Sequence, residues 1–177
     1  MAPWATERLR PEPALFPSDP ESRRAVEEAE RWEEAVLQPL PRRLSWWALA
    51  HDRSGLRSFA QGADLHIPVG LATRAAGPII TIERHINAAS DDNIRADMTT
   101  LAAMLDRVDE LLAMGTLGGG ELNTADYQIA TSLRLLMCFD DLRRSIERRP
   151  AGPYSLRVVP DFPGRVRRVI PADWLNV

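Results

Sequence analysis

The side chains that could bind a metal or attack a substrate are few and scattered. His51, His66 and His85 include no His-x-x-x-His pair, so they do not form a metal-binding face on one helix. Cys138 is the single cysteine, and it lies in the apolar run LLMCF at 135–139, as expected of a small buried hydrophobic residue. We therefore expect no metal site, no internal disulfide and no catalytic residue in this sequence.

Every basic residue is arginine, and no lysine is present. This absence excludes a Schiff-base lysine, a phosphate-loop lysine and a Ser–Lys catalytic pair. The glycines at 118–120 consequently indicate a turn between helices. Two carboxylate pairs, Asp91-Asp92 and Asp140-Asp141, fall where helices are predicted to start, and the field of a helix N-terminus explains them there.

Charge and hydropathy exclude other classes. The 22 basic and 25 acidic residues give a formal charge of −3, so no net basic field draws the protein to nucleic acid or to a membrane. Arg165, Arg167 and Arg168 are interpreted as a solvated end. No apolar run approaches the ~20 residues of a membrane span, and residues 1–7 lack the apolar region of a signal peptide. We expect a cytoplasmic protein with no nucleic-acid partner and no membrane association.

Trp46 and Trp47 are the candidate ligand-lining residues. Adjacent positions on a helix point about 100° apart, so both rings can be deeply buried only if they pack on two sides. We expect one ring in the core and the other in a cleft, where it would form part of a hydrophobic substrate pocket.

The elements that position these residues are predicted to be helices. An apolar stripe from Val26 to Val36 indicates a helix beginning at Glu21, with Ser18 or Asp19 as its cap. Pro20 fits the first turn of that helix.

Two prolines follow this first helix. We expect Pro39 and Pro41 to break or kink it, and the helix to resume over 44–51.

Glycine and proline divide residues 55–90 into two or three broken helices, the last of them kinked near Gly77-Pro78. Ile79 to Ile82 has strand propensity, but a lone strand would have no partner, so we predict helix there.

Residues 91–114 carry the clearest helical pattern. Apolar residues step by three and four along the segment, Ser90 and the following aspartates supply the N-terminal cap, and Gly115 supplies the stop.

A capping box begins the next predicted helix, over 124–139. The Asn123 side chain can accept a hydrogen bond from a backbone N–H two or three residues on, and Asp126 can accept from the N–H of Asn123. The apolar residues that follow indicate a buried helix.

A shorter helix is predicted to begin at Asp140-Asp141 and to end at Arg149-Pro150, with at most one more helix near 154–159. The fold class is therefore predicted to be all-α, a bundle of five to seven helices.

Several segments together resemble the C-terminal helical domain of glutathione S-transferases, especially bacterial ones. The resemblance covers residues 11–165. It rests first on a proline-rich connector, Pro11–Pro17, that leads through Asp19-Pro20-Glu21 into an amphipathic helix carrying Glu30-Arg31-Trp32. A later helix with Leu105–Asp109, the capped helix at Thr124–Ile129 and the pair Arg149-Pro150 complete it. In that family the box is usually Ser or Thr three residues before Asp, and Asn123 stands in that place here.

The resemblance also implies what these residues lack. In the family, a thioredoxin-like domain binds glutathione, activates its thiol through Tyr, Ser or Cys, and precedes the helices. Residues 1–10 resemble the end of that domain's last helix, and no other part of it is recognised here. We therefore expect residues 1–20 to be a helix end and linker, 21–165 the helical domain, and 166–177 an irregular tail.

Two functions follow as hypotheses. In the first, the chain supplies the hydrophobic-substrate side of a glutathione conjugation or exchange site and is inactive alone. Glutathione is then a co-substrate held elsewhere, and the partner is a second copy or a separately encoded thioredoxin-like domain. In the second, the chain is a non-catalytic helical module that binds hydrophobic small molecules or a partner protein.

Overall fold

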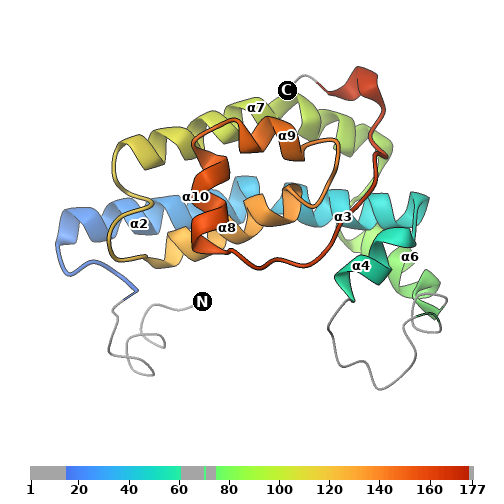
Figure 1. Cartoon of the computed structure of the whole chain (residues 1–177), viewed down its shortest axis with the longest axis horizontal. Coiled ribbons are helices and arrows are strands. Elements are labelled where there is room, and N and C mark those ends of the chain that lie inside the picture. The colour runs from blue at the N-terminus through green and yellow to red at the C-terminus, as the bar shows by residue number, and fades with distance from the viewer. Residues whose placement is uncertain (1–14, 61–69, 71–74, 176–177) are drawn as a thin grey trace.

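Helices make up all the regular secondary structure of the residues that the computed structural model describes, which are 15–60, 70 and 75–175 (Figure 1). The one strand-like pairing in these ranges is an isolated bridge between Phe139 and Val166. The expected all-α class is confirmed. Residues 1–14 of the expected linker, and His66, lie outside the described residues.

The first helical segment is a long rod built from three pieces. Helix α2 spans Pro20–Trp32, the π-helical turn η1 spans Glu33–Leu37, and α3 spans Pro39–His51 (Figure 1). The cap of α2 is Asp19, whose carboxylate accepts a hydrogen bond from the Ser22 N–H at 2.8 Å.

The expected interruption of the first helix before Pro39 and Pro41 is present, because α2 ends at Trp32, the π turn η1 follows, and α3 begins at Pro39 rather than at 44. A proline has no N–H to donate, and its ring clashes with the carbonyl four residues earlier. In η1 the spacing widens to five residues, so that the Gln38 N–H donates to the Glu33 carbonyl at 2.8 Å. The rod therefore continues through both prolines.

Two short helices lie at the α3 end of the rod. Helix α4 spans Ser54–Phe59 and α6 spans Gly77–Ile86, which confirms the preference for helix over strand at 79–82. Helix α6 begins at Gly77-Pro78, where a kink was expected, and because residues 71–74 lie outside the described residues, that kink stays a prediction. Pro78 occupies the first turn, where an N–H has no intrahelical acceptor to lose.

Helix α7 spans Asp91–Ala113, and the Ser90 side chain caps it by accepting from the Asn93 N–H at 3.3 Å. The predicted apolar stripe is buried along its length at Ile94, Met98, Leu101, Leu105 and Val108.

Helices α6 and α7 end in the same hydrogen-bonded motif with different residues. After α7, Gly115 has a φ of 75°, and the next residue, Thr116, donates its N–H to the Leu111 carbonyl. After α6, Ala88 adopts a φ of 49°, and Ala89 donates to the Arg84 carbonyl in the same way. Ala88 thus holds a left-handed position that glycine normally fills.

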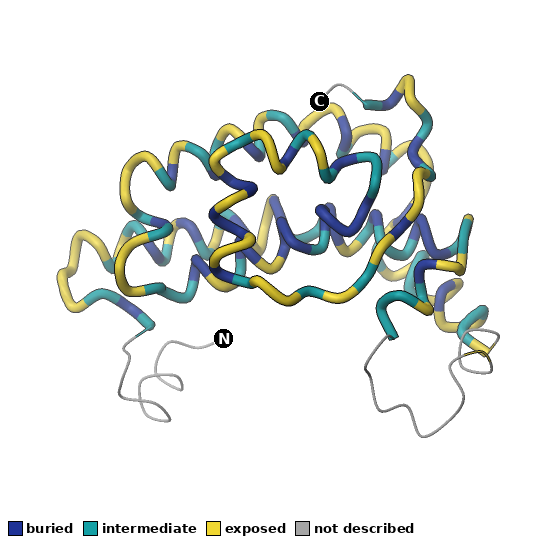
Figure 2. Tube along the Cα trace, in the orientation of Figure 1, coloured by how far each residue is buried: buried dark blue, intermediate teal, exposed yellow. Residues whose placement is uncertain are grey.

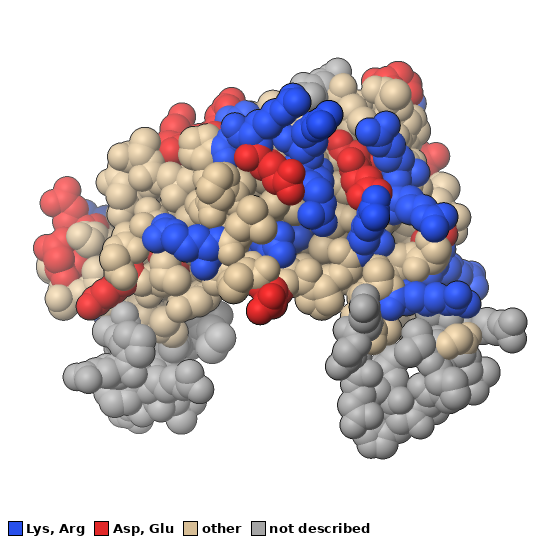
Figure 3. Space-filling model, viewed as in Figure 1, with Lys and Arg blue, Asp and Glu red and all other residues tan. Residues whose placement is uncertain are grey.

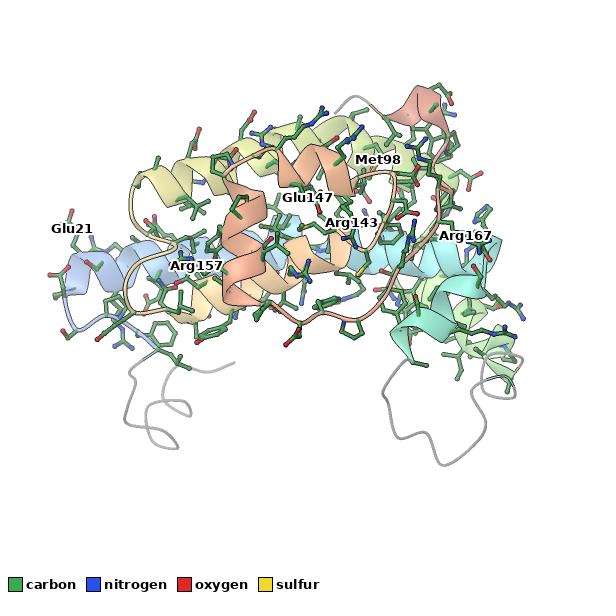
Figure 4. The ribbon with its side chains drawn as sticks, in the orientation of Figure 1. Glu21, Met98, Arg143, Glu147, Arg157 and Arg167 are labelled. Carbon is green, nitrogen blue, oxygen red and sulfur yellow. The ribbon has the colours of Figure 1, made fainter. Side chains whose placement is uncertain are left out.

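Helix α8, Thr124–Leu136, is the central helix of the fold. It contacts α2, η1, α3 and α10, and much of it is buried (Figure 2). Helix α9 spans Arg143–Glu147, with its first and last residues ion-paired at 3.8 Å (Figure 4), and α10 spans Ala151–Val158.

The carboxylates expected to begin a helix at 140–141 instead hold the C-terminal segment, and α9 begins two residues later. Asp141 accepts hydrogen bonds from the N–H groups of Val169 and Ile170, at 2.9 and 3.2 Å. Asp140 accepts from the Arg165 side chain at 2.9 Å. The pair therefore fixes the tail, which explains these acidic residues better than the helix field does.

The tail beyond residue 165 has little regular structure but joins the core. Val166 and Ile170 are buried, and the short 3-10 helix η2, Ala172–Trp174, places Trp174 against the rod. The Trp174 ring lies 5.8 Å from that of Trp47, and the Arg95 guanidinium lies over it at 4.9 Å.

Candidate functional site: a groove between α3 and α8

The two adjacent tryptophans have different surroundings, as neighbouring helical positions predict. Trp47 is 2% exposed and donates from Nε1 to Asp91 Oδ1 at 2.8 Å, with His51 stacked at 4.3 Å. Its role is structural, and it adds nothing to a ligand pocket. Trp46 is half-buried and lines a groove on the surface of α3.

One half of this groove is apolar and has a volume of about 430 Å³. Its walls come from α3, α4 and α8, so that the residues of three elements converge on it. The lining side chains are Gln38, Pro41, Arg42, Ser45, Trp46, Leu49, Leu56, Phe59, Thr131, Ser132 and Leu135.

The other half is polar and has a volume of about 660 Å³. Its lining residues are Glu33, Glu34, Gln38, Pro39, Arg42, Tyr127, Gln128, Thr131 and Ser132. Because Gln38, Arg42, Thr131 and Ser132 belong to both linings, the two halves are continuous, and we call them together the α3–α8 groove.

Glu33 is the unusual residue of the groove. It is 3% exposed, and its Oε1 accepts a hydrogen bond from the Ser132 hydroxyl at 2.7 Å. Burial raises the pKa of the Glu33 carboxyl above its ordinary value, and the neighbouring Glu34 and Glu30 act in the same direction. A buried acid at a π turn is an arrangement found often at functional sites.

The sequence reasoning missed Glu33, although a signal was present. The buried positions of the rod include Val26, Ala29, Glu33, Leu37 and Leu40. Their steps of three and four place a glutamate within the apolar stripe itself. A charged residue at a core position of an amphipathic helix is the pattern that could have identified it.

Both hydrogen bonds of the capping box are present beside the groove. Asn123 Oδ1 accepts from the Asp126 N–H at 3.2 Å, and Asp126 Oδ2 accepts from the Asn123 N–H at 2.9 Å. Asp126 is fully buried, and its Oδ1 also accepts from the Gly118 N–H at 2.7 Å and the Tyr154 hydroxyl at 3.0 Å. The box thus joins the start of α8 to the preceding loop and to α10.

Cys138 and the metal-ligating residue types form no second candidate site among the described residues. Cys138 is buried, as expected, and burial raises the pKa of its thiol to about 11, so that the thiol is protonated at neutral pH. Among the described residues, no three His, Cys, Asp or Glu side chains gather where they could hold a metal ion. Within the same ranges, no helix has both the length and the apolar character needed to cross a membrane.

Comparisons with protein-family models, with curated proteins and with solved structures found no significant match.

Proposed function

We propose that this chain is the helical half of a cytoplasmic glutathione S-transferase-type protein, and that it contributes the hydrophobic-substrate side of the site. The observation that carries the proposal is the apolar half of the α3–α8 groove, which Trp46 lines next to the capped, buried helix α8. Its volume of about 430 Å³ lies within the range of small-molecule sites.

The proposed division of labour follows from the chemistry of the groove. Its apolar half can remove hydrophobic surface from water, which provides affinity without a covalent step. In the family that the chain resembles, the thiol-activating residue belongs to a thioredoxin-like domain and not to the helices. Glutathione, the co-substrate, is therefore held by a thioredoxin-like domain supplied from outside the residues of this groove.

A binding experiment tests the substrate side. Titration with 1-decanol, followed by calorimetry, should give saturable binding that Trp46→Ala weakens by about tenfold, because the substitution removes an aromatic wall. Leu156→Ala, at an exposed position on α10, serves as the control and should bind as the unchanged protein does. Absence of saturable binding would contradict the proposal.

A second experiment tests the missing half. The chain alone should not conjugate glutathione to an aryl halide. Turnover should appear when a glutathione-binding thioredoxin-like domain is added in trans. Turnover by the chain alone would show that the thiol is activated here.

A second candidate function is binding of a partner protein without catalysis. What favours it is an apolar stripe on α6, where Ile79, Ile82 and Ile86 are 57%, 58% and 69% exposed. Exposed apolar patches often mark interaction surfaces. Ile82→Ser should then abolish partner capture without changing 1-decanol binding. If Ile82→Ser instead weakens only the binding of 1-decanol, the transferase-type role is favoured.

A further inference from the structure

One carboxylate oxygen in the α3–α8 groove has no protein partner. The Ser132 hydroxyl occupies Oε1 of Glu33, and no described residue donates to Oε2. In the described residues, every fully buried side-chain nitrogen or oxygen has a hydrogen-bond partner. Oε2 must therefore reach the groove that Glu33 lines, although the residue as a whole is only 3% exposed.

The charges around Oε2 favour a cation. Glu34 lines the same half of the groove, and Glu30 lies close enough to Glu33 to influence its titration. Arg42 is the one basic residue of the lining; its charge acts to lower the pKa of Glu33, but no ion pair joins it to Glu33 or Glu34 within the described residues. If all four groups are ionised, three negative charges face one positive charge.

The apolar half of the groove begins where this acidic half ends. The two halves share Gln38, Arg42, Thr131 and Ser132, so a ligand held at Glu33 extends along α3 into the start of the apolar half. Beyond these shared residues the walls are the side chains of Trp46 and Phe59. A ligand that fits must have an apolar body and a hydrogen-bond donor at one end.

We propose that the α3–α8 groove binds amphipathic amines, with the ammonium group donating to Oε2 of Glu33 and the apolar body extending along α3 toward Trp46. This inference rests on the proposed function, because it names the ligand class of the same groove.

An ammonium fits better than the alternative end groups. Both an ammonium and an alcohol can donate to the Glu33 carboxylate, but only the ammonium adds the Coulomb attraction of a full positive charge. A carboxylate would be repelled by Glu33 and Glu34, and its desolvation would not be offset. Among ligands of equal chain length, the order of affinity should therefore follow the charge of the end group, with the ammonium binding most tightly.

Three ten-carbon probes test the inference: n-decylamine, 1-decanol and decanoate, each titrated by calorimetry at pH 7.5. The amine should bind the unchanged protein about tenfold more tightly than the alcohol and more tightly still than decanoate. Glu33→Gln should reduce the affinity for the amine about tenfold and that for the alcohol by much less, so that the preference for the amine is lost.

Glu28→Gln is the matched control. Glu28 is exposed on α2 and lines neither half of the groove, yet the substitution changes the net charge equally. The control should retain the full preference for the amine. An equal loss in both variants would assign the preference to general charge attraction and overturn the proposal.

The outcomes separate this inference from the proposed function. Binding of 1-decanol without any preference for the amine overturns the inference alone. No binding of any probe overturns both. Because the selectivity of the unchanged protein is itself decisive, the test stands even if Glu33→Gln fails to fold.

Discussion

The Asp126 side chain accepts hydrogen bonds from outside the capping box as well as within it. The local spacing of Asn123 and Asp126 predicted the two reciprocal hydrogen bonds, since both depend only on the backbone of one helical turn. The contacts to Gly118 and Tyr154 depend on the packing of a loop and of α10, and nothing local in the sequence encodes them. Burial and the Asp126 carboxylate also raise the pKa of the Tyr154 hydroxyl, which keeps it a donor.

The two halves of the capping box should therefore differ in cost. Asn123→Ala should lower the free energy of unfolding by about 0.5–2 kcal/mol, the usual range for a lost cap. Asp126→Ala leaves the N–H groups of Gly118 and Asn123 without an acceptor and the Tyr154 hydroxyl with only the backbone carbonyl of residue 126, and should cost about 3–5 kcal/mol. Urea denaturation of both variants measures this, and equal losses would show that the contacts outside the box contribute nothing.

Glu33 predicts a dependence of stability on pH. Its pKa in the folded protein is raised above the ordinary 4.5, so between the two values the folded state binds more protons than the unfolded state. Its contribution to the free energy of unfolding is favourable at low pH and is lost as pH rises from about 4.5 through the folded pKa. Glu33→Gln removes this dependence and keeps an acceptor for Ser132.

Denaturation between pH 4 and pH 7.5 is the measurement. The Glu33→Gln variant should match the unchanged protein at the acidic end and become the more stable of the two toward neutral pH. Glu28→Gln should show no such gain in stability toward neutral pH. A parallel pH dependence for Glu33→Gln would mean that Glu33 is ionised without penalty.

At the scale of elements, the long periodic helices were predictable and their ends less so. The apolar stripe of α7 predicts both an α-helix and the face that it buries, because apolar residues that recur about every 3.6 positions line one side of an α-helix. The interruption near Pro39 and Pro41 was predictable, because a proline lacks the N–H that a helix interior needs. Its form, a π turn at Glu33–Leu37 that contacts α8, was not predictable from local sequence.

The left-handed residues that follow α6 and α7, Ala88 and Gly115, can each be replaced by the other's residue type to test the cost of this conformation. Ala88 is in the left-handed region with a φ of 49°, which costs a residue with a Cβ about 1–2 kcal/mol. Ala88→Gly should therefore raise the free energy of unfolding by about 1 kcal/mol, after the greater backbone entropy of glycine in the unfolded chain is subtracted.

Gly115→Ala is the reverse substitution at the equivalent position of α7. No atom lies within 4 Å of the added Cβ, so only the backbone conformation resists it. The variant should lose about 1 kcal/mol. Thermal denaturation of both compares them, and a loss of stability in Ala88→Gly would contradict the account of strain.

At the scale of the whole molecule, arginine side chains gather on the face formed by α9, α10 and the tail (Figure 3). Several are bound to acceptors from other elements. Arg149 donates to Asp106 and Asp109 of α7, and Arg157 donates to the Gly118 carbonyl at 2.9 Å (Figure 4). The solvated basic end predicted at Arg165, Arg167 and Arg168 is a separate group, in which the Arg165 side chain is 70% exposed but pairs with Asp140. The sequence could not show that Arg149 and Arg157 connect other elements, because their partners are distant in sequence.

Trp174 should be the residue through which the tail stabilises the core. Trp174→Ala removes a mostly buried ring that contacts Trp47 and Arg95, and should lower the free energy of unfolding by about 3 kcal/mol. The neighbouring Asp173 is exposed, so Asp173→Ala should change stability by less than about 0.5 kcal/mol. Similar small effects from both variants would show that the tail is not part of the cooperative unit.

The contact between Trp47 and Trp174 has a consequence for the order of synthesis. Domains generally begin to fold from the N-terminal side while the ribosome is still extending the chain. The rod that carries Trp47 is translated well before residue 174, whose ring packs against it. The nascent protein therefore keeps this edge of its core open until residue 174 has been made.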